Sequence, residues 1–177
     1  ILVPGDRVMG ILEDCAEKGA ASAVVISAGF AERGTSERKD LQKQVGEFAR
    51  SSGVRVCGPN CIGLLNLKAN ISASAYTHPT QCGVGPIALV SQSGGNAFGP
   101  LLSRAEDWGI GFSYVISTGN EADLESTDFI RYLLDDDGTR VIACYLEGFK
   151  DARKFLEVAR MAQERCKPLI VVKVGRS

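Results

Sequence analysis

Apolar and polar positions follow two alternating periods along the chain. Short apolar runs, typical of buried strands, alternate with segments whose apolar residues recur every three or four positions, as on one face of a helix. Strands are expected at residues 23–27, 54–57, 87–91, 112–117, 141–146 and 169–174. Helices are expected at residues 6–17, 36–50, 96–107, 126–134 and 151–164. Short connections between them predict an α/β protein with parallel sheets covered by helices.

The alternation is interrupted between residues 68 and 85. This stretch holds small polar residues and few large apolar ones, which indicates a linker. We therefore place a domain boundary near Gly83, with one unit at 1–83 and a second at 84–177. The second unit alternates as β-α-β-α-β-α-β, the pattern of a doubly wound open sheet. Both ends of the chain interrupt expected elements, so we expect the sequence to be part of something longer.

Composition and charge exclude several classes of protein. With 177 residues, 45% of them hydrophobic, the chain can bury a sizeable core without disulfides. Lys and Arg number 20 against 21 Asp and Glu, and no segment concentrates basic residues, so we expect no nucleic-acid partner. No apolar run approaches the roughly 20 residues that span a bilayer. We expect a cytoplasmic protein with no membrane partner.

The cysteines and the single histidine limit the chemistry further. The cysteines are Cys15, Cys57, Cys61, Cys82, Cys144 and Cys166. They form no Cys-x-x-Cys pair and most lie beside apolar residues, which favours buried, reduced thiols and no metal site. His78 is expected in a loop facing solvent. A catalytic pair of Cys61 and His78 would need a residue to orient the imidazole, and none is evident.

Ligands of open parallel sheets bind beyond the carboxyl ends of the strands. The first such position is occupied by Ser91, Gln92, Ser93 and Gly94, directly before an expected helix. Glycine lets an anion approach the backbone, and the free amides at a helix start favour negative charge. A plainer interpretation is that Ser93 only caps the helix. The two serines together with Gly94 and Gly95 favour a phosphate or carboxylate site.

Two further strand ends carry candidate residues. Glu147 follows residues 141–146, where its carboxylate can orient an imidazole or simply act as an acid at the start of the next helix. Both interpretations remain open at this stage. Gly119 and Asn120 follow residues 112–117 and can line the same crevice, although their spacing also fits an ordinary turn.

The first unit offers loop residues but no dinucleotide fingerprint. The candidate positions after its strands are Ser27, Ala28, Gly29, Asn60 and Cys61. Their backbone amides can approach a ligand. A Gly-x-Gly-x-x-Gly sequence is absent from the chain, so an NAD site has no direct support.

Four segments in order resemble the NDP-forming acyl-CoA synthetases, which are relatives of the succinyl-CoA synthetase α subunit. They are Gly-Pro-Asn-Cys-Ile-Gly at 58–63, Leu-Val-Ser-Gln-Ser-Gly-Gly at 89–95, Ser-Thr-Gly-Asn-Glu-Ala at 117–122 and Lys-Pro-Leu-Ile-Val-Val-Lys-Val-Gly-Arg-Ser at 167–177. The resemblance covers essentially the whole chain. It implies part of a Rossmann-like CoA-binding domain, followed by a flavodoxin-like ligase domain without its C-terminal end.

The resemblance also implies a reaction and roles for residues. In that family acyl-CoA, NDP and phosphate are interconverted with acid, CoA and NTP, and a histidine carries the phosphate to a distant ATP-grasp site. Ser91, Gln92, Ser93 and Gly94 resemble the phosphate loop, and Glu147 resembles the glutamate that orients the phosphohistidine. The segments that resemble the lining of the CoA site hold Val3, Pro4, Ser27, Ala28, Gly29, Asn60 and Cys61. ATP or GTP with Mg is expected on an ATP-grasp partner, within an oligomer.

Two departures from the family pattern bear on function. The glycine-rich loop that opens the CoA-binding domain belongs before Ile1, and the phosphohistidine belongs after Ser177; His78 lies at neither place. We therefore expect a chain that is part of a larger synthetase and is inactive alone. The alternatives are a non-catalytic CoA- or acyl-CoA-binding regulatory module, fused for example to an acyltransferase, and a nucleotide-binding flavodoxin-like protein.

Overall fold

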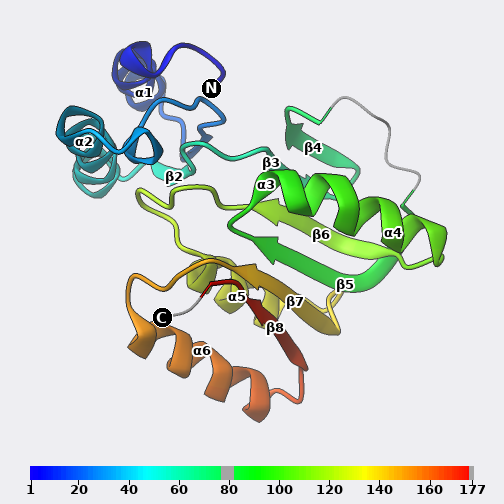
Figure 1. The fold of residues 1–177 in the computed structure, drawn as a ribbon. Coiled ribbons are helices and arrows are strands. Elements are labelled where there is room, and N and C mark those ends of the chain that lie inside the picture. Colours follow the sequence, from blue (N-terminus) through cyan, green and yellow to red (C-terminus); the bar gives the residue numbers. More distant parts are fainter. Residues whose placement is uncertain (77–81, 176–177) are drawn as a thin grey trace.

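The computed structural model of the protein describes residues 1–76 and 82–175 (Figure 1). The elements of the first part are η1 (Gly5–Arg7), α1 (Val8–Glu17), β1 (Ser22–Val24), η2 (Ala31–Arg33), α2 (Ser36–Ser52), β2 (Arg55–Cys57), β3 (Gly63–Asn66) and β4 (Ile71–Ser74). Those of the second part are β5 (Val84–Ser91), α3 (Gly94–Asn96), the π-helical segment η3 (Ala97–Leu101), α4 (Leu102–Asp107), β6 (Phe112–Ser117), α5 (Ser126–Asp135), β7 (Val141–Leu146), α6 (Ala152–Glu164) and β8 (Leu169–Lys173). His78 lies outside the described residues, as do Arg176 and Ser177.

A six-stranded sheet organises most of the chain, with the strand order β4-β3-β6-β5-β7-β8. Strands β6, β5, β7 and β8 are parallel, and β3 runs antiparallel to both β6 and β4. Figure 1 shows α3 and α4 on one face of this sheet and α5 and α6 on the other. A separate parallel pair, β1 and β2, carries α1 and α2. The expected α/β architecture is confirmed.

Part of the stretch expected as a linker, residues 68–85, forms a strand. Strand β4 lies within this stretch, and β3 and β4 form an antiparallel pair that extends the large sheet. Because the β4 residues are mostly small and exposed, no alternation of apolar side chains marks the strand in the sequence. The hairpin therefore belongs to the same sheet as the second unit, although it precedes Gly83 in the chain.

The helix expected at residues 96–107 begins earlier and is not uniform. It starts at Gly94 and passes through a π-helical turn that contains Pro100. Proline has no N–H group to donate to the preceding turn, and Gly99 adopts φ −97° and ψ −107°, outside helical values. The earlier start places the first turn of this helix directly at the end of β5.

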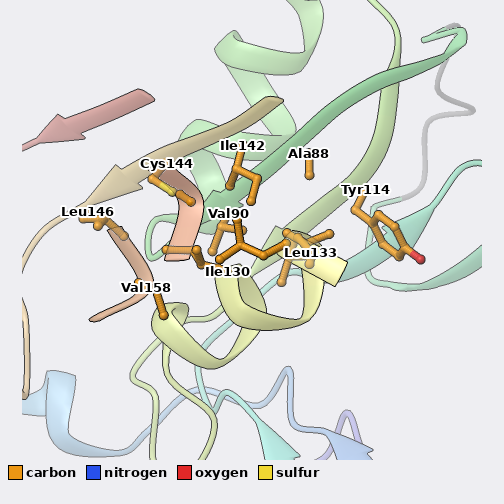
Figure 2. Close-up of a cluster of buried hydrophobic side chains, with 12 residues drawn as sticks. Ala88, Val90, Tyr114, Ile130, Leu133, Ile142, Cys144, Leu146 and Val158 are labelled. Carbon is orange, nitrogen blue, oxygen red and sulfur yellow. The ribbon is translucent and has the colours of Figure 1, made fainter. Parts of the chain in front are cut away.

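Buried side chains fill both faces of the large sheet. On one face, Ile130 and Leu133 of α5 pack against Val90 and Ile142 of the central strands, as Figure 2 shows. The spacing of three between Ile130 and Leu133 puts both on one side of the helix, which is the period that the sequence shows. On the other face, Phe98 and Leu102 join the cluster that covers β5 and β6. A packed core on both faces thus supports the loops at the strand ends.

All six cysteines are free thiols. Cys57, Cys61, Cys82 and Cys144 are buried, Cys15 is half-buried and Cys166 is exposed. Among residues 1–76 and 82–175, no group of three or more His, Cys, Asp or Glu side chains is placed to hold a metal ion. Within the same residues, no helix has the length and apolar character needed to cross a membrane.

Burial makes these thiols differ in reactivity, which alkylation can measure. Burial raises the pKa of Cys144 to about 12, and burial with the neighbouring Glu106 carboxylate raises that of Cys82 to about 12. Because the thiolate is the reactive form, both thiols should stay unlabelled by iodoacetamide in mildly alkaline buffer, while Cys166 is labelled fully. Unfolding in urea should make the labelling rates of the three thiols equal. Labelling of native Cys144 as fast as Cys166, read by peptide mass spectrometry, would contradict this prediction.

Candidate functional site

The loops after three neighbouring parallel strands meet at one edge of the sheet. Ser91 at the end of β5 pairs in register with Ser117 of β6 and with Tyr145 of β7. Backbone hydrogen bonds continue just beyond the strands, from the Thr118 amide to the Ser91 carbonyl at 2.8 Å and from the Gln92 amide to the Tyr145 carbonyl at 3.0 Å. The candidate residues that follow these three strands therefore lie side by side at the carboxyl edge of the sheet.

The loop after β5 forms a tight helix start. The Ser93 hydroxyl accepts a hydrogen bond from the Asn96 amide at 3.5 Å, so Ser93 is the N-cap. The buried Ser91 hydroxyl donates to the Ser93 carbonyl at 2.8 Å. A Cβ at Gly94 would lie 2.5 Å from the Ile62 side chain, so only glycine fits there. Ser93 does cap the helix; the first helical amides have no intrahelical acceptor and remain candidates for an anion.

Gln92, expected to bind phosphate, has a fully engaged side chain. Its Oε1 accepts hydrogen bonds from the backbone amides of Glu147 at 2.6 Å and Gly148 at 2.9 Å. Its Nε2 donates to the Gly148 carbonyl at 2.9 Å and to Glu121 Oε2 at 3.1 Å. The side-chain amide has no hydrogen-bonding capacity left for a phosphate in this arrangement. The Gln92 backbone amide is also engaged, because it donates to the Tyr145 carbonyl.

Glu121 is a buried residue at the site that was not expected from the sequence. It is 3% exposed and its φ is 57°. Its carboxylate accepts hydrogen bonds from the Thr118 hydroxyl at 2.8 Å, the Ser126 amide at 2.9 Å, the Ser126 hydroxyl at 2.5 Å and Gln92 Nε2. Lys150 donates from Nζ to the Glu121 carbonyl oxygen. The hydroxyls on either side of Glu121 in the sequence were the available signal.

Glu147, unlike the buried Glu121, has a side chain that is exposed to solvent. It is exposed at the end of β7, and within the described part of the chain no residue donates a hydrogen bond to its carboxylate. Its backbone amide, in contrast, is held by Gln92. The Glu147 side chain is therefore free to accept a hydrogen bond from a group that enters the site.

The loop after β6 contacts the loop after β2 closely. Gly119 has φ 60°, and a Cβ there would lie 2.3 Å from the Pro59 carbonyl oxygen. The Asn120 amide donates to the same oxygen at 2.8 Å, and Asn60 Nδ2 donates to Asn120 Oδ1 at 3.1 Å. Residues expected at a CoA site and residues expected at the active-site loop are thus neighbours.

One cavity of about 470 Å³ joins most of these positions. Its lining includes Asn60, Cys61, Gln92, Ser93, Gly94, Gly119, Asn120 and Glu147. A second cavity of about 340 Å³ shares Gln92, Gly119, Asn120 and Glu147. Of the expected site residues, those outside both linings are Ser91, Val3, Pro4, Ser27, Ala28 and Gly29.

Several expected CoA-site residues that lie outside both cavities make hydrogen bonds within the first unit. The Ser27 hydroxyl accepts a hydrogen bond from the Val3 amide at 3.0 Å, and the Gly29 amide donates to Glu32 at 2.5 Å. Glu32, which was not expected at the site from the sequence, lines both cavities and accepts a hydrogen bond from Asn120 Nδ2 at 2.6 Å. Partial burial acts to raise the pKa of Glu32, but hydrogen bonds from Gly29 and Asn120 outweigh it and hold the pKa below its ordinary value. Glu32 is thus a charged link between the two units.

Comparison with protein families matches two successive domain models. Residues 84–177 match the succinyl-CoA ligase like flavodoxin domain, and residues 1–66 match a CoA binding domain. The first match alone covers more than half of the chain. The chain belongs to the succinyl-CoA-ligase-like flavodoxin domain family. The resemblance to NDP-forming acyl-CoA synthetases that the sequence motifs indicate is confirmed.

Similar proteins are larger than this chain. It is 41% identical over 177 residues to the α subunit of an ADP-forming acetate–CoA ligase II of Pyrococcus furiosus, covering 100% of this chain and 37% of the relative. It is 40% identical over 178 residues to an ADP-forming acetate–CoA ligase of Methanocaldococcus jannaschii, of which it spans 24%. The chain therefore spans between about a quarter and somewhat over a third of these relatives.

Solved structures agree in fold. The dinucleotide-forming acetyl-coenzyme A synthetase 1 of Ca. Korarchaeum cryptofilum, in complex with phosphate and ADP, superposes with a TM-score of 0.89 at 38% identity. The match covers 99% of this chain and 37% of the synthetase chain. The Rossmann-like and flavodoxin-like arrangement expected for the two parts is confirmed.

Proposed function

We propose that this chain supplies the CoA-binding and CoA-ligase parts of an NDP-forming acyl-CoA synthetase. The complete enzyme would interconvert acyl-CoA, NDP and phosphate with acid, CoA and NTP, through a phosphohistidine carried elsewhere. The names of the similar proteins, ADP-forming acetate–CoA ligases, support this reaction class. The chain acts within a longer polypeptide or an assembly of subunits.

The observation that carries the proposal is the shared cavity of about 470 Å³. Its size lies within the range of roughly 300–1,000 Å³ that is typical of sites for small ligands. Loops of the first unit, with Asn60 and Cys61, line one part of it, and the helix start at Gly94 and Glu147 line another. Such a cavity can hold a thioester on one side and an anionic phosphoryl group on the other.

The residues take distinct roles in this proposal. Within 84–177, the first amides of the helix at Gly94 bind the phosphoryl group through their hydrogen atoms and the helix dipole. The exposed Glu147 carboxylate accepts the N–H of the incoming imidazole, which selects the tautomer whose other nitrogen is the nucleophile. Within 1–83, Asn60 and Cys61 contact CoA near the reacting thiol.

The remaining CoA contacts lie beyond the cavity lining. We assign to more distant parts of CoA the segments that hold Val3, Pro4, Ser27, Ala28 and Gly29. ATP or GTP with Mg binds to an ATP-grasp domain or subunit, in an oligomeric cytoplasmic enzyme. Ser91 supports the phosphate loop from beneath, through its hydrogen bond to the Ser93 carbonyl.

Phosphate transfer can be tested in a longer protein that contains this chain together with an ATP-grasp part. Incubation with NTP labelled on the γ-phosphate should produce a protein-bound label that is stable in base and lost in acid. Added acid and CoA should discharge it, with the label recovered in free phosphate. CoA binding without any label would contradict the proposal and favour the non-catalytic CoA-binding module.

A further inference from the structure

The Gln92 side chain is the direct connection between three loops of the site. It leaves the end of β5, reaches the backbone after β7 through Glu147 and Gly148, and reaches the loop after β6 through Glu121. Each of its polar atoms makes two hydrogen bonds. A planar amide that is saturated in this way has a single orientation.

The partner that orients Gln92 is itself fixed. Glu121 is buried, and its carboxylate is held by the Thr118 hydroxyl and by the amide and hydroxyl of Ser126. These donors belong to the loop after β6 and to the first turn of α5, which rests on the core of the sheet. The packed core and α5 therefore fix the position of Glu121, and Glu121 in turn fixes the orientation of Gln92.

The group that Gln92 holds is the backbone that carries Glu147. The Glu147 carboxylate is exposed and has no hydrogen-bond donor among the described residues, so its location depends on its backbone. Two consecutive amides there, at 147 and 148, donate to one oxygen at 2.6 and 2.9 Å. This contact fixes the peptide plane from which the Glu147 side chain starts.

We propose that Gln92 is a positioning residue that places the Glu147 carboxylate for hydrogen bonding to the imidazole, with Glu121 as its buried anchor. The proposal rests on the function proposed above for Glu147. The position requires both an acceptor and a donor. An apolar side chain at 92 leaves the amides at 147 and 148 without their acceptor, and a carboxylate at 92 has no N–H for Glu121 and places two like charges side by side.

Hydrogen exchange of this chain tests the positioning without any assay of activity. In Gln92→Met, which keeps the length of the side chain and removes its polar atoms, the amides of Glu147 and Gly148 should exchange at least about tenfold faster. Gln44→Met, at an exposed position on α2, is the matched control and should leave both amides unchanged. If Gln92→Met unfolds the chain, Gln92→Asn, which shortens the amide by one methylene, should give the same local pattern. Unchanged exchange at 147 and 148 would overturn the proposal.

A double-mutant cycle in the longer enzyme tests the link to Glu147. Gln92→Met should lower the rate constant of phosphohistidine formation from acyl-CoA and labelled phosphate by about tenfold and leave the KM for acyl-CoA unchanged. In a Glu147→Gln background the same substitution should cost nothing more, because Gln92 acts through Glu147. An equal loss in both backgrounds would show a general structural role and overturn the proposal. Absence of label in the wild-type enzyme would instead contradict the proposed function, and the exchange result would stand by itself.

Discussion

Replacing Glu147 with Gln lowers the rate of phosphohistidine formation by about 100-fold or more in an enzyme that contains this chain. The carboxylate accepts the N–H on one imidazole nitrogen and leaves the other as the nucleophile. Gln has the same size but no charge, and its amide can donate to the imidazole and stabilise the wrong tautomer. The measurement is the rate at which labelled inorganic phosphate, supplied together with acyl-CoA, enters the protein in a rapid-quench experiment.

The stability of the Glu147→Gln variant should match that of the wild type. The carboxylate is exposed and has no hydrogen-bond donor among the described residues, so its loss removes no contact from the fold. Glu164→Gln, an exposed position at the end of α6, is the matched control for a lost surface charge and should label at the normal rate. Normal labelling of Glu147→Gln would remove Glu147 from the mechanism.

Replacing Glu121 with Ala lowers the free energy of unfolding of this chain by about 3 kcal/mol. The substitution leaves the Thr118 hydroxyl, the Ser126 amide and hydroxyl, and Gln92 Nε2 without their buried acceptor. Each unsatisfied buried donor costs roughly 1–3 kcal/mol, and part of this is offset by removing the cost of burying a charge. Urea denaturation followed by circular dichroism measures the change.

The matched comparison for this prediction is Glu164→Ala. Glu164 is exposed at the end of α6, so its removal should shift the urea midpoint little. Glu121→Gln should also destabilise the chain, because the amide group turns N–H donors toward donors that need an acceptor. A midpoint for Glu121→Ala equal to that of Glu164→Ala would show that the buried carboxylate is not required for the fold.

The strands and helices of the second unit were accessible from local patterns. The apolar runs at 112–117 and 141–146 coincide with β6 and β7, because buried parallel strands are apolar on both faces. Strand β4 was not predicted, since its residues are mostly small and exposed. A hairpin at a sheet edge leaves a weak pattern in the sequence.

The candidate site divides in a similar way. Gly94, Gly119 and Glu147 were expected at strand ends, and they do meet, because β5, β6 and β7 are parallel and in register and open at the same edge. Asn60 follows β2 of the separate pair and lines the same cavity, because its loop contacts the loop after β6. Glu121 and Glu32 were missed, since their partners are remote: Gln92 lies 29 positions from Glu121, and Asn120 lies 88 from Glu32. A pattern read over a few neighbouring positions therefore contains only one member of either pair.

The amino-acid sequence alone therefore determined most of the helices and strands and which polar residues follow each strand. Hydrophobic periodicity and turn residues depend on only a few neighbouring positions, so they predict helices and strands without any knowledge of tertiary packing. Hydrogen-bond partners depend on which loops face each other after the sheet and its helices have packed. Only the tertiary structure shows that the Gln92 side chain, expected to bind phosphate, instead connects Glu121 to the backbone of Glu147. The same packing leaves the Glu147 carboxylate without a hydrogen-bond donor among the described residues, at the lining of the cavity.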